Sequence, residues 1–375
     1  MISEPFSMAF AATCCLALMP LVIRMRAFGY SDVDSPQHVH TKSTSRLGGV
    51  ALFLAYVLGI LIEIALGPAR PGPMLALLAC ASPVFLAGIL EDVTRKIPPK
   101  HRLVAAVVSA VLASVLAGGV IVRLDLPYVD GWLTYRVVAV LLTCFMVAGA
   151  CNALNLIDGA NGLAGGTALL MFIGMAAMAV RVGDNIAFVQ AATMIGAIAG
   201  FLFWNYPRAR VFLGDGGAYF IGFVYAELSI QIVAHNEQVS AWFVVMLAAY
   251  PIMETLYSIY RRKIQLRTPS TEPDAMHLHS LVYHRVTLPA EHARPDADHE
   301  RANGRVALRL WPHGLICLVL ALGFHDQTGS LIACLAAYAT LYVIHYKILW
   351  KIHRTPPDDP NLAFQEQRRA NANQA

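Results

Sequence analysis

Long uninterrupted runs of apolar residues constrain this chain more than any other feature of its sequence. A helix that crosses the hydrocarbon core of a bilayer needs about 20 apolar residues, and runs of that length recur along the 375 residues. Charged residues make up only 14% of the chain, whereas a soluble domain carries about a quarter. The sequence therefore predicts an all-α, polytopic membrane protein.

We expect about eleven membrane-spanning helices. Each candidate is an apolar run of suitable length, and the runs lie near residues 6–24, 48–67, 73–90, 103–122, 136–154, 163–180, 188–204, 216–234, 239–260, 310–325 and 329–349. The seven cysteines lie inside or beside these runs without paired spacing, which is typical of buried thiols and not of disulfides or metal sites. No basic segment precedes the first run, so we expect it to be retained as a helix.

The distribution of lysine and arginine predicts the orientation of the helices, because cytoplasmic loops are enriched in these residues. If the N-terminus lies outside, the C-terminus and one set of loops are cytoplasmic, and this set with its adjoining helix ends carries 24 of the 28 Lys and Arg residues. These loops are 25–47, 91–102, 155–162, 205–215 and 261–309. We expect one transmembrane domain over residues 1–350, with a long cytoplasmic loop at 261–309. The polar tail, 351–375, is expected to be disordered.

Five polar motifs fall on this predicted cytoplasmic side. They are Ser45-Arg46-Leu47-Gly48-Gly49, Glu91-Asp92, Asn152-xx-Asn155-xx-Asp158-Gly159, Leu213-Gly214-Asp215-Gly216 and His277-Leu278-His279. A charged side chain at the centre of a membrane helix costs about 2.5–3.5 kcal/mol, so carboxylates at membrane depth usually have a function. Asp215 lies between glycines, where backbone amides can approach a phosphate closely and a carboxylate can hold a metal.

Each motif alone also has a structural explanation. Glu91 and Asp92 could mark a helix end, with the basic residues after them binding lipid phosphate. Asn152 and Asn155 share a helix face and could hydrogen-bond a neighbouring helix. Together, however, the carboxylates suit Mg²⁺, which binds one or two carboxylates plus substrate phosphates, and nearby Arg and Lys side chains can hold further phosphates. Zinc is disfavoured because the histidines have no cysteine partner.

The five motifs, in this order over residues 30–285, resemble the polyprenyl-phosphate N-acetylhexosamine-1-phosphate transferase family. That family includes the phospho-MurNAc-pentapeptide translocase and undecaprenyl-phosphate GlcNAc-1-phosphate transferases. The resemblance implies a Mg²⁺-dependent enzyme, with Mn²⁺ as a substitute, at the cytoplasmic face of the bacterial inner membrane. It would move a sugar-1-phosphate from a UDP-amino sugar to undecaprenyl phosphate and release UMP, initiating lipid-linked surface polysaccharide synthesis.

The resemblance also implies roles for individual residues. Catalytic roles fall on Glu91, Asp92 and Asp158, and the metal falls on Asp215. Substrate binding falls on Arg46, Asn152, Asn155, Asn161, His277 and His279. Membrane lipids are further expected partners, nucleic acid is not, and a homodimer is left open.

Three positions depart from the family pattern. Glu91 stands where Asp is usual, Asn161 where a second Asp is common, and Ser280 where a further histidine is common. Ser280 and the Pro36-Gln37 segment favour the polysaccharide-initiating branch. The alternatives are the peptidoglycan translocase, a transporter or flippase, and an inactive homologue with a scaffolding role. The transporter is disfavoured because no internal repeat is visible and the acidic residues lie on one side.

Overall fold

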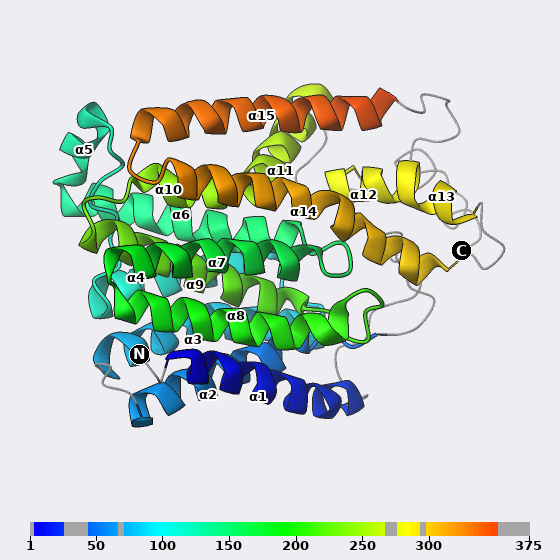
Figure 1. The fold of residues 1–375 in the computed structure, drawn as a ribbon, viewed down its shortest axis with the longest axis horizontal. Coiled ribbons are helices and arrows are strands. Elements are labelled where there is room, and N and C mark those ends of the chain that lie inside the picture. Colours follow the sequence, from blue (N-terminus) through cyan, green and yellow to red (C-terminus); the bar gives the residue numbers. More distant parts are fainter. Residues whose placement is uncertain (1–3, 26–43, 67–70, 267–275, 293–297, 352–375) are drawn as a thin grey trace.

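A computed structural model describes residues 4–25, 44–66, 71–266, 276–292 and 298–351 as a bundle of side-by-side helices (Figure 1). Within these residues, 10 helices are long and apolar enough to cross a membrane, or 11 spans if one bent helix pair counts as a span. The predicted all-α polytopic fold with about eleven spans is confirmed. The tail beyond Lys351 and the Pro36-Gln37 segment lie outside the described residues.

The long helices are α1 (Glu4–Arg24), α2 (Gly48–Leu66), α3 (Pro71–Thr94), α4 (Pro99–Leu116), α6 (Arg136–Leu156), α7 (Leu163–Val182), α8 (Asn185–Asn205), α9 (Gly214–His235), α14 (His299–Gly323) and α15 (Thr328–Lys351). The short helices are α5 (Pro127–Leu133), α10 (Ala241–Leu247), α11 (Ala249–Tyr260), α12 (Leu278–Val282) and α13 (Leu288–His292), with π-helical turns η1 (Arg261–Leu266) and η2 (Tyr283–Thr287).

The predicted span 239–260 is a bent pair of helices, because α10 and α11 meet at an angle of 74°. Pro251 lies in the first turn of α11. It has no N–H to donate to the carbonyl of Leu247, and its ring excludes a helical carbonyl at that position. The helix that begins as α10 therefore ends at Leu247, and α11 leaves in a new direction.

The prediction that residues 261–309 form one long loop is partly wrong, because part of this segment is helical. Helix α14 begins at His299, and α12, η2 and α13 occupy much of the preceding segment. The polar first turns of α14 pack against these short elements. One contact is a hydrogen bond of 2.6 Å from Arg309 to the hydroxyl of Thr287. Helix α14 therefore begins before its apolar part, because its polar first turns pack against other parts of the protein.

Helix α9 lies at the centre of the bundle. In its apolar stretch 94% of the residues are buried, and it packs against α2, α3, α4, α6, α7 and α8. Small residues let the backbones of packed membrane helices approach closely. A Cβ atom on Gly88 of α3 would lie 2.5 Å from the Cα atom of Gly216. A Cβ atom on Gly49 of α2 would lie 2.5 Å from that of Gly217. The first turn of α9 is thus held between α2 and α3.

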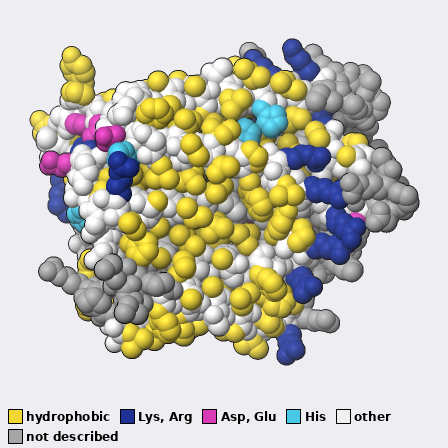
Figure 2. Space-filling view, in the orientation of Figure 1, with side chains coloured by type: hydrophobic (Ala, Val, Ile, Leu, Met, Phe, Trp, Pro, Cys, Tyr) yellow, Lys and Arg dark blue, Asp and Glu magenta, His cyan; other side chains and the backbone are white. Residues whose placement is uncertain are grey.

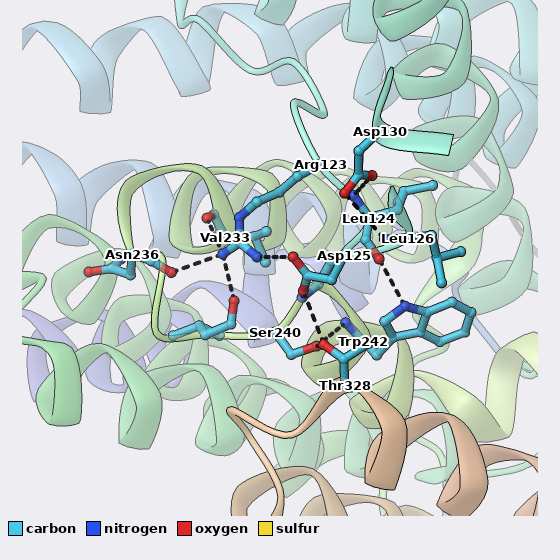
Figure 3. Close-up of polar contacts among 12 residues, drawn as sticks. Arg123, Leu124, Asp125, Leu126, Asp130, Val233, Asn236, Ser240, Trp242 and Thr328 are labelled. Atoms are coloured by element: carbon cyan, nitrogen blue, oxygen red, sulfur yellow. Dashed lines mark hydrogen bonds and ion pairs between the residues drawn. The ribbon is translucent and has the colours of Figure 1, made fainter. Parts of the chain in front are cut away.

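The opposite end of the bundle is closed by a polar network that joins the loop before α5 to the end of α9 (Figure 3). Arg123 donates to the carbonyl oxygens of Val233, Asn236 and Val239 at 3.0, 3.1 and 2.7 Å. Asp125 accepts from the backbone N–H of Ala241 at 2.7 Å. Burial opposes ionisation of Asp125, but this hydrogen bond and Arg123 outweigh it and lower its pKa. The network satisfies carbonyls that a helix end leaves unpaired.

Charge is segregated along the bundle. Figure 2 shows Lys and Arg side chains along the right-hand edge and a cluster of Asp and Glu at the left, with an apolar belt between them. Exposed Arg24, Arg208 and Arg210 lie at or just beyond the ends of α1 and α8. This is the distribution expected of a membrane protein whose basic end is cytoplasmic.

Candidate active site

The first and fourth sequence motifs are joined by backbone hydrogen bonds. The N–H of Phe212 donates to the carbonyl of Ser45 at 2.8 Å, and the N–H of Gly48 donates back to Phe212 at 3.0 Å. The N–H of Gly49 donates to the carbonyl of Leu213 at 2.8 Å. This short parallel pairing holds the Arg46 segment beside the first turn of α9, although about 165 residues separate them along the chain.

Asp92, at the end of α3, binds the N-terminus of α9. Its two carboxylate oxygens accept from the backbone N–H groups of Asp215 and Gly216, each at 2.9 Å. Asp92 is fully buried, and the N-terminus of a helix favours a negative charge. Gly214 has a φ of 73°, and a Cβ atom there would lie 2.6 Å from Asp92 Oδ2. The glycine therefore permits both the turn and the close approach of Asp92.

Two arginines connect the carboxylates of this site. Arg46 Nε lies 3.7 Å from Asp92 Oδ1, and an Arg46 terminal nitrogen lies 3.6 Å from Asp215 Oδ1. Arg102, in the first turns of α4, pairs with the other oxygen of Asp215. Its guanidinium lies 5.7 Å from the centre of the Tyr219 ring. Arg102 is mostly buried, so its charge is directed into the site.

Asp158 lies in the turn between α6 and α7. Burial raises the pKa of Asp158 to about 7, and the nearby Arg46 guanidinium partly opposes that rise. Asp158 is also close enough to Asp92 for their charges to interact. Asn152 and Asn155, both half-buried, lie on the last two turns of α6 that lead into Asp158. The third motif is thus brought to the same end of the bundle as the first two.

Asn161 is occupied inside the protein. Its backbone N–H donates to the side chain of Asn303 at 2.6 Å, and its side-chain amide donates to the carbonyl of Pro207 at 3.1 Å. Only 3% of Asn161 is exposed. It ties the Asp158 turn to the end of α8 and to α14, while its predicted contact with substrate stays a prediction.

The histidine motif lies against the Asp158 turn. The rings of His277 and His279 stack with their centres 5.4 Å apart. His279 packs so closely on Gly159 that a Cβ atom there would collide with the imidazole. The fifth motif therefore joins the third, as the predicted common site requires.

Glu91 is the residue that the structure separates from its sequence neighbour. Its carboxylate accepts from the backbone N–H of Ile97 at 2.7 Å, and so caps the turn that follows α3. Asp92 contacts α9 instead. The adjacent acids of the second motif therefore have different surroundings, and the predicted catalytic role of Glu91 stays a prediction.

The carboxylates of the site fit a magnesium ion. Both oxygens of Asp92 accept backbone N–H groups, so the remaining acidic donors are Asp158 and Asp215. The oxygens of Asp215 face Arg46 and Arg102, so a cation bound there would replace an arginine contact. Mg²⁺ prefers one or two carboxylates and completes its shell with water and substrate phosphate oxygens. Within the described residues no group of three or more His, Cys, Asp and Glu is placed to hold a metal, so a cage made only of protein ligands is not formed there.

Sequence comparison agrees with this geometry. The protein-family model described as Glycosyl transferase family 4 matches residues 74–233. A "Probable undecaprenyl-phosphate N-acetylglucosaminyl 1-phosphate transferase" of Bacillus subtilis is 30% identical over 276 residues, which are 70% of this chain and 73% of that protein. This chain belongs to glycosyl transferase family 4. The resemblance of its motifs to the polyprenyl-phosphate N-acetylhexosamine-1-phosphate transferases is confirmed, and membership in a transferase family disfavours the transporter alternative.

Other family 4 relatives carry related names. A "Decaprenyl-phosphate N-acetylglucosaminephosphotransferase" of Mycolicibacterium smegmatis is 26% identical over 286 residues, 68% of this chain and 70% of the relative. A "Phospho-N-acetylmuramoyl-pentapeptide-transferase" of Staphylococcus carnosus is 28% identical over 241 residues, 60% of this chain and 74% of the relative. The match to the family model contains Asp92, Asp158 and Asp215 but excludes Arg46 and the histidine motif.

Two residues of this candidate site were not among the predicted site residues. Arg102 was one of several basic residues after α3, and no motif distinguished it from the others. Glu254 of α11 lies 3.2 Å from His277 and belongs to none of the five sequence motifs. A buried acid within a span is itself a signal of function, and that signal could have identified Glu254.

Proposed function

We propose that this enzyme transfers an N-acetylhexosamine-1-phosphate, with GlcNAc-1-phosphate as the first choice, from a UDP-sugar to undecaprenyl phosphate. The observation that carries the proposal is the convergence of Arg46, Arg102, Asp92, Asp158 and Asp215 at the basic end of the bundle. The names of the relatives from Bacillus and Mycolicibacterium support the lipid acceptor and the sugar donor. The product would initiate a lipid-linked surface polysaccharide at the cytoplasmic face of a bacterial inner membrane.

In the proposed reaction, a phosphate oxygen of undecaprenyl phosphate forms a bond to the β-phosphorus of the UDP-sugar. The bond from that phosphorus to the bridging oxygen breaks, and UMP leaves with the oxygen and its electron pair. Arg46 and Arg102 are placed to hold phosphate oxygens by charge-assisted hydrogen bonds. Mg²⁺ held by Asp215 and Asp158 would neutralise the diphosphate and the leaving UMP.

A strong protein base is not needed for this attack. A phosphate monoester has a second pKa of about 6, so it is largely ionised near neutral pH. Asp92 is engaged by two backbone N–H groups, and this favours a role in holding Asp215 in place. Positioning and charge neutralisation therefore supply most of the catalysis in this proposal.

The peptidoglycan translocase reaction is the second candidate, and the staphylococcal relative favours it. It would use the same site with a UDP-MurNAc-pentapeptide donor. Ser280, in place of a further histidine, favours the polysaccharide branch. The two candidates differ in donor and share the chemistry.

The first test is transfer of label from radiolabelled UDP-GlcNAc to undecaprenyl phosphate by the purified full-length protein, with Mg²⁺ or with EDTA. Asp215→Ala should abolish the product, whereas Glu237→Ala, an exposed acid at the opposite end of the bundle, should not. Lipid-linked label that needs Mg²⁺ and Asp215 supports the proposal. If only UDP-MurNAc-pentapeptide gives product, the second candidate replaces it. If no UDP-amino sugar gives product, the proposal is wrong.

A further inference from the structure

Glu254 of α11 connects three elements that are far apart in the sequence. It is 1% exposed, and each of its carboxylate oxygens has a partner. Oε1 accepts from the backbone N–H of Leu278 at 2.9 Å. Oε2 accepts from the hydroxyl of Tyr342, in α15, at 2.8 Å. A buried carboxylate with charge-assisted bonds on both oxygens strongly restricts the groups that donate to it.

The same carboxylate orients His277. Its Oε1 lies 3.2 Å from His277 Nδ1, and the hydroxyl of Ser258, one turn along α11, lies 3.1 Å from the same nitrogen. The ring that faces Glu254 also stacks on His279, and His279 packs on Gly159. A movement of Glu254 would therefore move both histidines relative to the Asp158 turn.

Helix α15 holds the histidine turn at a second point. The hydroxyl of Tyr346 donates to the carbonyl of Met276 at 2.9 Å. Tyr257 of α11 packs on both tyrosines of α15, with ring centres 5.8 Å from Tyr342 and 4.6 Å from Tyr346. The turn is thus held by contacts with both α11 and α15.

We propose that Glu254 is a positioning residue that, together with Tyr342, fixes the His277–His279 turn against the Asp158 turn and thereby sets the affinity for the sugar nucleotide. Glu254 and α15 both lie beyond residues 74–233, the part of the chain that matches the family model. The C-terminal helices would therefore determine donor binding in a site whose acidic groups come from the matched part. The inference rests on the proposed function for its kinetic consequence.

Glu254→Gln is the informative variant because glutamine keeps the volume of the side chain and one carbonyl oxygen. It removes the charge and places an N–H₂ group where a donor already points. Loss of one such charged hydrogen bond predicts a rise of about tenfold in KM for the UDP-sugar, with kcat little changed. Tyr342→Phe should act in the same direction and less strongly. The matched control is Glu227→Gln, which changes a buried carboxylate of α9 that makes no hydrogen bond to any described residue.

A double mutant separates positioning from general loss of stability. If Glu254 acts through His277, adding Glu254→Gln to His277→Ala should raise KM no further than His277→Ala does alone. Hydrogen exchange of residues 276–283, followed by mass spectrometry on the full-length protein, should be faster in Glu254→Gln and unchanged in Glu227→Gln. Additive losses in the double mutant would overturn the inference.

The exchange measurement also distinguishes this inference from the proposed function. Faster exchange in Glu254→Gln supports the positioning role even if the wild-type protein transfers none of the donors, in which case the proposed function alone fails. An active wild-type protein with unchanged KM and unchanged exchange in Glu254→Gln would overturn the positioning role and leave the proposed function intact.

Discussion

Asp92→Asn tests whether the carboxylate of Asp92 builds the site by holding the first turn of α9. Both oxygens of Asp92 accept backbone N–H groups at 2.9 Å. Asparagine offers one carbonyl oxygen and directs its amide group at the other N–H, so at least one charge-assisted bond is lost. Such a bond contributes about 1.5–3 kcal/mol, which corresponds to a loss of transfer activity of roughly 10- to 150-fold.

The assay is steady-state transfer to undecaprenyl phosphate between pH 6 and pH 9, with thermal unfolding in detergent measured alongside. We expect the loss at every pH, because the lost contact is positional. Asp92→Ala, which removes both acceptors, should lose more. Glu91→Gln should lose less, because it keeps a carbonyl oxygen for the N–H of Ile97.

Two results would refute this reasoning. Turnover of Asp92→Asn above half of the wild-type value would mean that the two hydrogen bonds do not hold Asp215 in place. Recovery of wild-type activity as the pH rises would instead assign Asp92 the role of proton acceptor for the lipid phosphate.

Three further predictions concern stability, measured by thermal unfolding in detergent. Gly88→Ala places a Cβ atom 2.5 Å from the backbone of Gly216 and should cost about 1–3 kcal/mol, whereas Gly149→Ala, with open space around it, should stabilise α6 by up to about 1 kcal/mol. The pKa of Asp158 is raised to about 7, so between about pH 4 and pH 7 the native state holds more protons than the unfolded state. Stability from this group therefore falls as the pH rises through that window, and Asp158→Asn should remove this part of the slope. Glu227 has no hydrogen-bond partner within the described residues, so Glu227→Met should stabilise the protein by about 1–3 kcal/mol.

Each of these has a contrary outcome. Equal stability of Gly88→Ala and Gly149→Ala would show that α3 and α9 are less tightly packed than the structure indicates. An Asp158→Asn protein with the same pH slope as the wild type would show that Asp158 titrates near its ordinary pKa. A less stable Glu227→Met protein would show that the carboxylate has a stabilising partner.

The local pattern of the sequence determined the fold class, the approximate spans and the end of the helix bundle at which the motifs gather. Apolar runs and the placement of lysine and arginine are properties of short segments, so they can be read without knowledge of packing. The bend between α10 and α11 was missed, although Pro251 is a local signal for it. The start of α14 was missed because its first turns are polar and are satisfied by α12, η2 and α13.

Tertiary structure alone decided what each polar residue of the site contacts. Asp92 and Glu91 are neighbours in the sequence, yet one binds the N-terminus of α9, 123 residues away, and the other caps the adjacent turn. Arg102 and Glu254 are assigned to the site because they contact residues of other helices there. Side-chain direction and helix packing set these contacts, and neither is encoded in the spacing of a motif. The sequence by itself therefore identified the transferase family, and the packing of α3, α9, α11 and α15 determined which groups each site residue contacts.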